Sequence, residues 1–239
     1  MGSIYLIRHG QASFGKADYD ELSKKGHQQA EVLGEHFRKC FLNSGKQPDR
    51  FVSGALKRHR QTAAGCLKAL GFNSESEAPR LIEMSGFDEF NHLEVLHRWR
   101  PQWEDRTTMA AELARHPVPH KAFQEAFIAA VDRWISGAFD SDYAEPWQAF
   151  QQRVEAAFDE LIATAGESKK TLVFTSGGPI AVIVGKVLGL DIKGIFAVNE
   201  NLANAGVTRV LYSAGKVSLS YLNNYSYLES LERGLLTYR

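Results

Sequence analysis

The stretch Ser3-Ile4-Tyr5-Leu6-Ile7-Arg8-His9-Gly10-Gln11 decides the fold of this chain. Ser3–Arg8 is a short run of β-branched, aromatic and aliphatic side chains with little polar interruption, which is typical of a strand covered on both faces of a sheet. A histidine, a glycine and a polar loop follow at once. In open α/β sheets, ligands bind beyond the carboxyl ends of the strands. The stretch therefore predicts a buried strand that ends at a candidate binding loop.

Two further segments have the same order of strand and then helix. Arg50–Ser53 predicts a second strand, and the apolar helix predicted after it ends at Gly71. Thr171–Thr175 predicts another buried strand. Gly177-Gly178-Pro179 then predicts a tight turn, with Pro179 as the first residue of a helix that reaches Leu188.

The remaining core segments complete an α/β architecture. Ser23 is a predicted N-cap for a helix with apolar residues at helical spacing, namely Ala30, Leu33, Phe37 and Phe41. Gly206–Tyr212 and Val217–Leu222 predict a final hairpin. Strands that alternate with helices indicate a three-layer α/β/α sandwich with a mostly parallel sheet, to which the hairpin adds at least one antiparallel strand.

Residues 86–145 differ in character from the rest of the chain, because they are rich in Trp, Phe, His and Arg and contain two helical stretches, Thr107–Arg115 and Lys121–Phe139. A long amphipathic helix over Pro146–Ala165 follows, and Gly166 ends it. We interpret residues 1–239 as a single domain, with residues 86–145 as an inserted helical lobe that caps the binding site.

Composition excludes several classes of protein. The 239 residues carry 28 Lys+Arg and 28 Asp+Glu, so the formal net charge is zero. Such a chain has no overall field that would hold nucleic acid or anionic lipid, and any anion must bind at a local site. The first residues lack a basic, apolar leader pattern, and no 18-residue apolar stretch occurs. We expect a cytoplasmic protein whose two cysteines, Cys40 and Cys66, are buried, reduced thiols.

The predicted strand ends bring together groups that suit a phosphoryl ligand. Arg8 and His9 follow the first strand, Arg58 lies just beyond the second, and Ser176-Gly177-Gly178 follow the Thr171–Thr175 strand. Guanidinium forks and the backbone N–H groups of a helix N-terminus bind phosphoryl oxygens. A histidine among them is suited to act as a nucleophile.

In combination these segments resemble the histidine phosphatase superfamily, the phosphoglycerate-mutase-like proteins whose signature is Arg-His-Gly after the first strand. The matching segments are Leu6–Gln11, Leu22–Ala30, Ser53–Ala63, Leu81–Glu83, Val173–Gly178 and Asn204–Val207. The resemblance covers about residues 3 to 90 and 145 to 212 and leaves the predicted lobe unmatched.

The resemblance implies a role for each matching residue. His9 would be the nucleophile that forms a phosphohistidine, and Glu83 would be the acid, for which Asp88 and Glu89 are the alternatives. The groups that would bind the phosphoryl group are Arg8, Gln11, Arg58, Ser176 and Gly177. It implies a metal-independent phosphatase without a cofactor, acting on a small phosphorylated substrate.

Three departures from the family pattern leave alternatives open. Ser176 stands where the family has its second histidine. Ala12 and Gly15 replace the hydroxyl and the amide of the mutase loop, and Met84–Glu89 replaces a basic segment that mutases carry. The last two departures favour a phosphomonoesterase over a phosphoglycerate mutase. The first leaves open a catalytically weak pseudoenzyme that binds a phosphorylated ligand.

The replacement by Ser176 predicts a slow catalyst, because a neutral hydroxyl donates a weaker hydrogen bond to a phosphoryl oxygen than a charged imidazole does. If another group has taken over that role, His59 and His92 are the candidates.

Overall fold

The computed structural model describes residues 1–13, 20–45, 47–72, 80–231 and 234–238, and it divides the chain into two compact units. One unit consists of Met1–Glu89 and Val154–Arg239, and the other of Phe90–Arg153. The helical lobe predicted over residues 86–145 overlaps the second unit. Its role as a cap stays a prediction.

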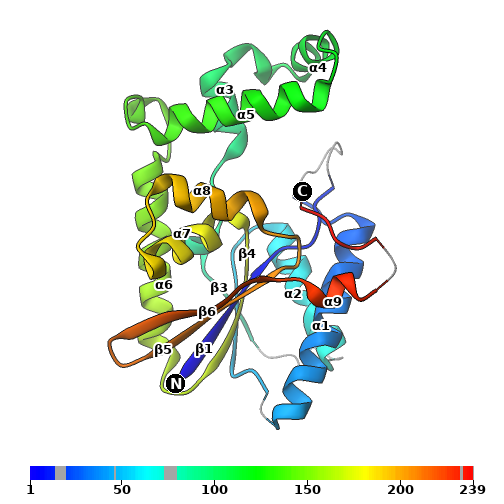
Figure 1. Ribbon diagram of the computed structural model, residues 1–239, viewed down its shortest axis with the longest axis vertical. Coiled ribbons are helices and arrows are strands. Elements are labelled where there is room, and N and C mark those ends of the chain that lie inside the picture. The colour runs from blue at the N-terminus through cyan, green and yellow to red at the C-terminus, as the bar shows by residue number, and fades with distance from the viewer. Residues whose placement is uncertain (14–19, 46, 73–79, 232–233, 239) are drawn as a thin grey trace. The chain divides into compact units, whose positions relative to one another are not determined.

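A single sheet forms the centre of the first unit (Figure 1). Its strands in the described residues are β1 (Gly2–Arg8), β2 (Arg50–Ser53), β3 (Leu81–Glu83), β4 (Lys170–Thr175), β5 (Val207–Ser213) and β6 (Lys216–Asn224), in the order β3-β2-β4-β1-β5-β6. The first four strands in that order are parallel, whereas β5 is antiparallel to both β1 and β6. The predicted mostly parallel sheet and final hairpin are confirmed.

Alternating side chains of the strands bury both faces of the sheet. Tyr5 and Ile7 of β1 join the apolar cluster on the face covered by α1 (Lys24–Ser44), α2 (Lys57–Leu70) and α9 (Ser226–Glu229). Ile4 and Leu6 point to the other face, because successive strand residues alternate, and both are fully buried.

Helices complete the layer on that other face. The elements there are the C-terminal part of α6 (Trp147–Ala165), α7 (Gly177–Leu188) and α8 (Ile192–Asn201) (Figure 1). α7 contacts β1 and packs on α8. The sheet thus lies between two helical layers, as predicted for a three-layer sandwich.

The start of α7 differs from the sequence prediction. Gly177 and Gly178 already belong to the helix, with Ser176 as its N-cap, so they form its first turn rather than a turn before it. Pro179 is accommodated because the first N–H groups of a helix have no intrahelical acceptor. α7 is apolar over nearly its whole length, and its residues from Gly177 to Gly185 are buried.

The second unit is helical. It contains α3 (His92–Trp99), the short helix η2 (Pro101–Glu104), α4 (Arg106–Ala114), α5 (Pro119–Ile135), the short helix η3 (Asp140–Asp142) and the start of α6. Trp134 is the centre of its aromatic core: its ring stacks on Phe90 at 4.7 Å and meets Trp147 edge-on at 5.3 Å.

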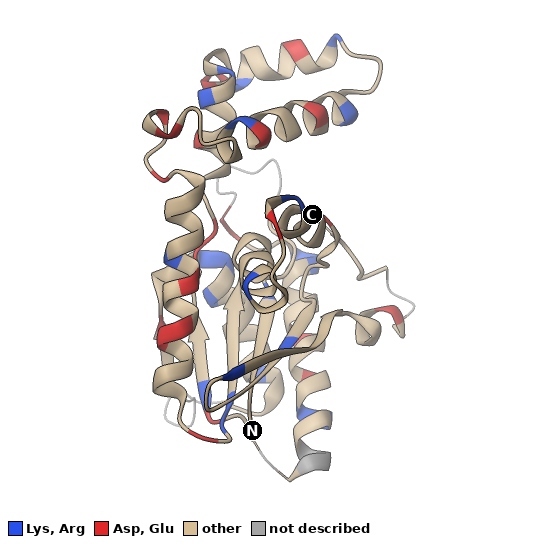
Figure 2. Cartoon of the chain, turned by 60° about the vertical axis from the view of Figure 1, so that its left-hand side comes forward, with Lys and Arg blue, Asp and Glu red and all other residues tan. Residues whose placement is uncertain are grey.

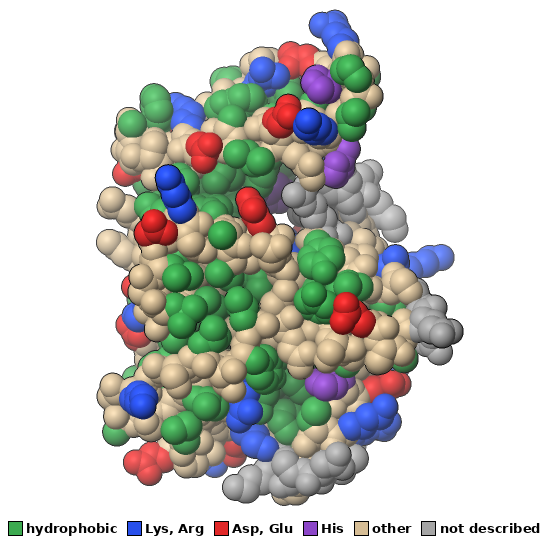
Figure 3. Space-filling model, in the orientation of Figure 1, with side chains coloured by type: hydrophobic (Ala, Val, Ile, Leu, Met, Phe, Trp, Pro, Cys, Tyr) green, Lys and Arg blue, Asp and Glu red, His purple; other side chains and the backbone are tan. Residues whose placement is uncertain are grey.

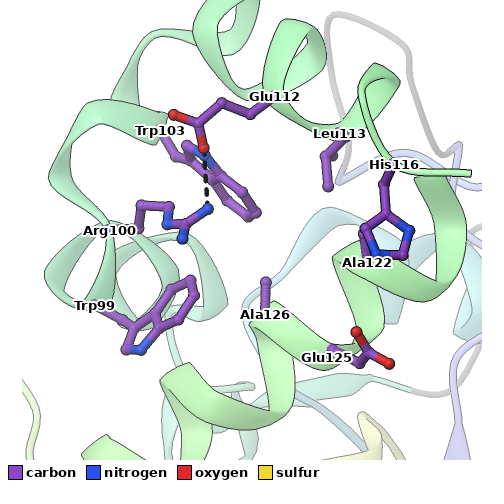
Figure 4. A pocket seen from close by; sticks show the side chains of 9 residues that line it. All are labelled: Trp99, Arg100, Trp103, Glu112, Leu113, His116, Ala122, Glu125 and Ala126. Atoms are coloured by element: carbon purple, nitrogen blue, oxygen red, sulfur yellow. Dashed lines mark hydrogen bonds and ion pairs between the residues drawn. The ribbon is translucent and has the colours of Figure 1, made fainter.

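A hollow of about 340 Å³ lies among α3, η2, α4 and α5 of this unit (Figure 4). The Arg100 guanidinium lies 4.7 Å from the ring centre of Trp99 and 4.9 Å from that of Trp103. Its Nη1 donates to Glu112 Oε2 at 2.9 Å, and Trp103 Nε1 donates to the same oxygen at 2.8 Å. Glu112 therefore compensates the charge of Arg100 within the hollow. This ion pair links α4 to the residues after α3.

Acidic and basic residues both occur along the helices (Figure 2), and charged side chains of both signs lie on the face drawn in Figure 3. None of the helices in the described ranges has the length and apolar character needed to cross a membrane. Cys66 is buried, and burial raises the pKa of its thiol. The prediction for Cys40 is wrong: it is exposed, because Phe37 and Phe41 occupy the core-facing side of α1.

Replacing Phe174 with Ala should lower the free energy of unfolding by about 3–5 kcal/mol, because the ring is fully buried in β4 and its removal leaves a cavity in the core. Urea unfolding measures this change. Leu188→Ala at the end of α7 is the control, since Leu188 is 50% exposed and its truncation should cost no more than about 0.5 kcal/mol. Equal losses in the two variants would contradict the assigned core.

Candidate functional site

The carboxyl ends of four parallel strands meet at one edge of the sheet. Arg8 pairs with Thr175, and Ser53 pairs with both Phe174 and Glu83. The chain continues the pairing for one residue beyond β1, since His9 N donates to Thr175 O at 2.8 Å. This register brings the predicted residues of β1, β4 and α2 to one place.

His9 is buried, with 7% of its surface exposed, and a hydrogen bond orients its ring. Nδ1 lies 2.7 Å from Gly10 O, so Nδ1 carries the proton and donates it to that carbonyl, while Nε2 keeps its lone pair. Burial lowers the pKa of His9 well below 6.5, and the charges of Arg58 and Arg8 lower it further; the Gly10 carbonyl has a smaller opposing effect. At neutral pH this histidine is an uncharged base.

Close packing of two glycines supports the loop after His9. A side-chain Cβ at Gly10 would lie 2.5 Å from Gly26 O, and one at Gly26 would lie 2.2 Å from Gln11 O. Only glycine fits at either position, which explains why the Arg-His-Gly segment and the start of α1 each contain one. Gly10 N also donates to Thr62 Oγ1 at 3.0 Å.

Arg58 lies in the first turn of α2 and is 6% exposed. Its Nη1 donates to Asp20 Oδ1 at 2.7 Å, an ion pair that orients the guanidinium. Among the residues that the structure describes, its buried Nε has no hydrogen-bond partner. The ion pair with Asp20 therefore holds this arginine from one side.

Arg8 projects from the end of β1 toward the C-terminal segment and α7. Its Nη1 donates to the carbonyl oxygens of Leu202 and Tyr238, the second at 2.9 Å. A Cβ at Gly177 would lie 3.7 Å from Arg8 Nε, so this arginine runs beside the first turn of α7. Gln11 supports the same loop: its N donates to Gln29 Oε1 at 2.7 Å, and its side-chain oxygen accepts from Ser23 Oγ at 2.9 Å.

Ser176 is fully buried and its hydroxyl contacts a histidine, His59 of α2, at 2.7 Å. The ring centres of His59 and His9 are 5.8 Å apart. His59 thus lies in the cluster, whereas the other candidate, His92, begins α3 in the second unit. The sequence motifs did not indicate Asp20, whereas Thr62 lies within the matching segment Ser53–Ala63 without a role assigned to it.

The three candidate acids lie in different surroundings. Glu83, the expected acid, is 52% exposed at its side chain and pairs with the exposed Arg60 at 3.1 Å. Asp88 Oδ1 accepts from Ala55 N at 2.6 Å. Glu89 Oε2 accepts from Gly178 N at 3.1 Å, at the N-terminus of α7. Of the three, Glu89 lies nearest to the helix terminus that was predicted to bind phosphate.

A hydrogen bond between the end of β4 and the segment after β3 explains how Glu89 reaches α7. Thr175 Oγ1, at the end of β4, donates to Phe87 O at 2.5 Å and ties the segment after β3 to the end of β4. The residues that follow Phe87 are therefore carried to the start of α7. Within the described residues, His, Cys, Asp and Glu form no group of three that would hold a metal ion.

Comparisons with known proteins agree with this architecture. A family model described as "Histidine phosphatase superfamily (branch 1)" matches residues 4–137 and 101–225. Among solved structures, the chain is similar to a phosphoglycerate mutase from Bacillus anthracis, with 21% identity, a TM-score of 0.64 and 95% of each chain covered. No match was found among curated proteins.

Two of the similar structures are phosphatases. One is a mycobacterial glucosyl-3-phosphoglycerate phosphatase in complex with VO3, with 20% identity, a TM-score of 0.61, and 93% of this chain and 99% of that chain covered. The other is a phosphoserine phosphatase mutant from Entamoeba histolytica in complex with phosphoserine, with 17% identity, a TM-score of 0.59, and 95% and 100% covered. At these identities the similarity establishes the fold alone.

Proposed function

The chain belongs to the histidine phosphatase superfamily (branch 1), and from this premise we propose that it is a metal-independent phosphomonoesterase that works through a phosphohistidine on His9. The observation that carries the proposal is the state of His9. A buried imidazole whose Nδ1–H is held by Gly10 O, beside two arginines, has a free lone pair on Nε2 at neutral pH.

In the first step, Nε2 of His9 attacks phosphorus in line with the ester oxygen. The N–P bond forms as the P–O bond to the leaving group breaks. Arg8 and Arg58 neutralise the equatorial oxygens, across which the charge of a loose transition state is spread. The unpartnered Nε of Arg58 is available for one of these contacts. Since the arginines supply the positive charge, this step needs no metal.

The departing alkoxide requires a proton. We assign this proton to Glu89, because of the three candidate acids its carboxyl group lies nearest to the start of α7, where the phosphoryl group is expected. Glu83 is the alternative, and it would have to leave Arg60 to reach the ester. In the second step the same carboxylate takes a proton from water, which attacks phosphorus, breaks the N–P bond and releases inorganic phosphate.

Two other functions are alternatives to the phosphatase, and a turnover assay distinguishes them. A phosphoglycerate mutase fits the name of one structural relative, although Ala12 lacks the hydroxyl expected of a mutase loop. Gly15, which replaces the amide of the mutase loop, lies outside the described residues. A binding protein without turnover is suggested by Ser176 in place of the second histidine.

The test is turnover of p-nitrophenyl phosphate in the presence of EDTA, with and without 2,3-bisphosphoglycerate. A phosphatase releases phosphate steadily under both conditions. A mutase transfers phosphate between phosphoglycerates only after priming by the bisphosphate. Binding of vanadate without any turnover would identify a pseudoenzyme and would overturn the proposal.

A further inference from the structure

Ser176 occupies an N-cap position but does not serve as a cap. An N-cap serine normally accepts a hydrogen bond from the N–H of the second or third helical residue. Here the second, Gly178, donates to Glu89, and the third is Pro179, which has no N–H. No side-chain capping bond is formed. The hydroxyl of Ser176 is therefore available for another partner.

That partner is His59. Its Nε2 lies 2.7 Å from Ser176 Oγ, and both side chains are fully buried. The two residues are 117 positions apart in the sequence and come from different layers, α2 and the β4–α7 junction. The contact joins the position of the missing second histidine to an imidazole from another helix.

Asp88 faces the other nitrogen of the same ring. Its Oδ1 lies 3.6 Å from His59 Nδ1, an ion-pair distance when the imidazole is charged. Gly54 makes this approach possible: a Cβ there would lie 2.3 Å from His59 Nδ1 and 2.5 Å from Asp88 Oδ1. The backbone is thus built to admit the carboxylate next to the ring.

We propose that His59 and Ser176 together replace the missing second histidine, with Asp88 as the carboxylate that holds the imidazolium. This inference rests on the proposed phosphatase function. Protonated His59 donates from Nε2 to Ser176 Oγ, which turns the hydroxyl hydrogen toward a phosphoryl oxygen. Ser176 contacts the substrate, whereas His59 and Asp88 are positioning residues that act through it.

His59 gains and loses one proton in each turnover of this relay, which consists of Asp88, His59 and Ser176. In the free protein His59 is neutral, because burial lowers its pKa; Arg58 lowers it further, whereas Asp88 and Asp20 raise it. His9 also lies beside it and is itself neutral. As the phosphoryl group binds, His59 takes one proton, from solvent or from a monoanionic ester. The proton returns to inorganic phosphate as it leaves.

Two simpler interpretations make different predictions. A purely structural histidine would affect stability but not the pH dependence of binding. A serine nucleophile activated by His59 and Asp88 would carry the phosphoryl group itself as an acid-stable phosphoserine. In our proposal His9 remains the nucleophile that attacks phosphorus, so the trapped phosphate should lie on His9 and not on Ser176.

The experiment is a double-mutant cycle of Ser176→Ala and His59→Gln, with vanadate affinity and kcat for p-nitrophenyl phosphate as readouts. Glutamine keeps a hydrogen-bond donor near Ser176 but does not titrate. We expect each single variant to lower kcat by about 10²- to 10³-fold, as for loss of one transition-state donor. The double variant should lose no more than the worse single variant, because both remove one relay.

A pH series supplies the readout that a structural role would not change. The ratio of vanadate affinities, wild type over His59→Gln, should fall as the pH rises from 5 to 8, because only the wild type binds the additional proton. A constant ratio, additive losses, or phosphate trapped on Ser176 would overturn the relay. If His59→Gln does not fold, Ser176→Ala replaces it in the same pH series. Because vanadate binding needs no turnover, failure of the phosphatase proposal leaves this test intact.

Discussion

Replacing His9 with Ala should lower kcat for p-nitrophenyl phosphate by about 10⁴-fold or more, because removal of a covalent nucleophile leaves only the binding groups. The fold should survive, since His9 follows β1 and, within the described residues, its ring makes one side-chain hydrogen bond, to Gly10 O. Mass spectrometry after a quench without acid should find phosphate on His9 in the wild type and none in the variant. Normal turnover by His9→Ala would exclude the mechanism.

His27→Ala is the matched control, because His27 lies exposed on α1 and should leave kcat unchanged. The same variants test the electrostatics of the site. The folded-state pKa of His9 lies well below the ordinary 6.5, so the unfolded chain binds this proton more readily. The free energy of unfolding should therefore fall as the pH drops below about 6.5, by up to about 1.4 kcal/mol per pH unit. It should fall less steeply in His9→Ala than in His27→Ala.

Replacing Glu89 with Gln should slow hydrolysis of alkyl phosphates by about 10²- to 10⁴-fold, because an alkoxide leaving group needs a proton in the transition state. Activated phenyl esters should be affected far less, because a phenolate departs without that proton. The measurement is kcat across esters whose leaving groups differ in pKa. A steeper dependence in Glu89→Gln than in the wild type identifies the acid.

Glu83→Gln and Asp88→Asn are the matched controls, since each also removes one carboxylate from the segment after β3. Glu83 pairs with Arg60 at the surface, so its replacement should leave the leaving-group dependence as in the wild type. Asp88→Asn should lower kcat for all esters alike, because its proposed role is to hold His59. If Glu83→Gln alone shows the steeper dependence, the acid is Glu83.

Vanadate binding separates the two carboxylate roles further. Loss of the acid should leave the affinity for vanadate nearly unchanged, whereas loss of the carboxylate that faces His59 should weaken binding more at low pH than at high pH. The contrast between Glu89→Gln and Asp88→Asn therefore distinguishes proton donation to the leaving group from support of the phosphoryl group.

The amino-acid sequence alone determined the layers of the first unit. The apolar run at Ser3–Arg8, the helical spacing of Leu33, Phe37 and Phe41, and the alternation of strands and helices all depend on neighbours along the chain. Local periodicity reports directly which side of an element is buried. For the same reason the Arg-His-Gly motif was enough to locate His9 and Arg8 at a strand end.

Helix boundaries at special residues were harder to predict. The glycine pair 177–178 suggests a turn, yet both residues are helical in α7, a buried helix that contacts the sheet and α8. Cysteine is usually buried, yet Cys40 lies on the exposed side of its helix. In the first case tertiary burial outweighed the local preference of glycine, and in the second the orientation of the helix outweighed the usual burial of cysteine.

Only the tertiary structure decided which side chains meet at the site. Ser176 and His59 are 117 positions apart, and Gly178 and Glu89 are 89 apart, so no local pattern couples them. Their contacts follow from the strand order, which places β4 between β2 and β1, and from the bond of Thr175 to Phe87. The sequence determined what each segment becomes, because secondary structure depends on near neighbours. Which carboxylate and which imidazole face the nucleophile depended on how the sheet brings distant segments together.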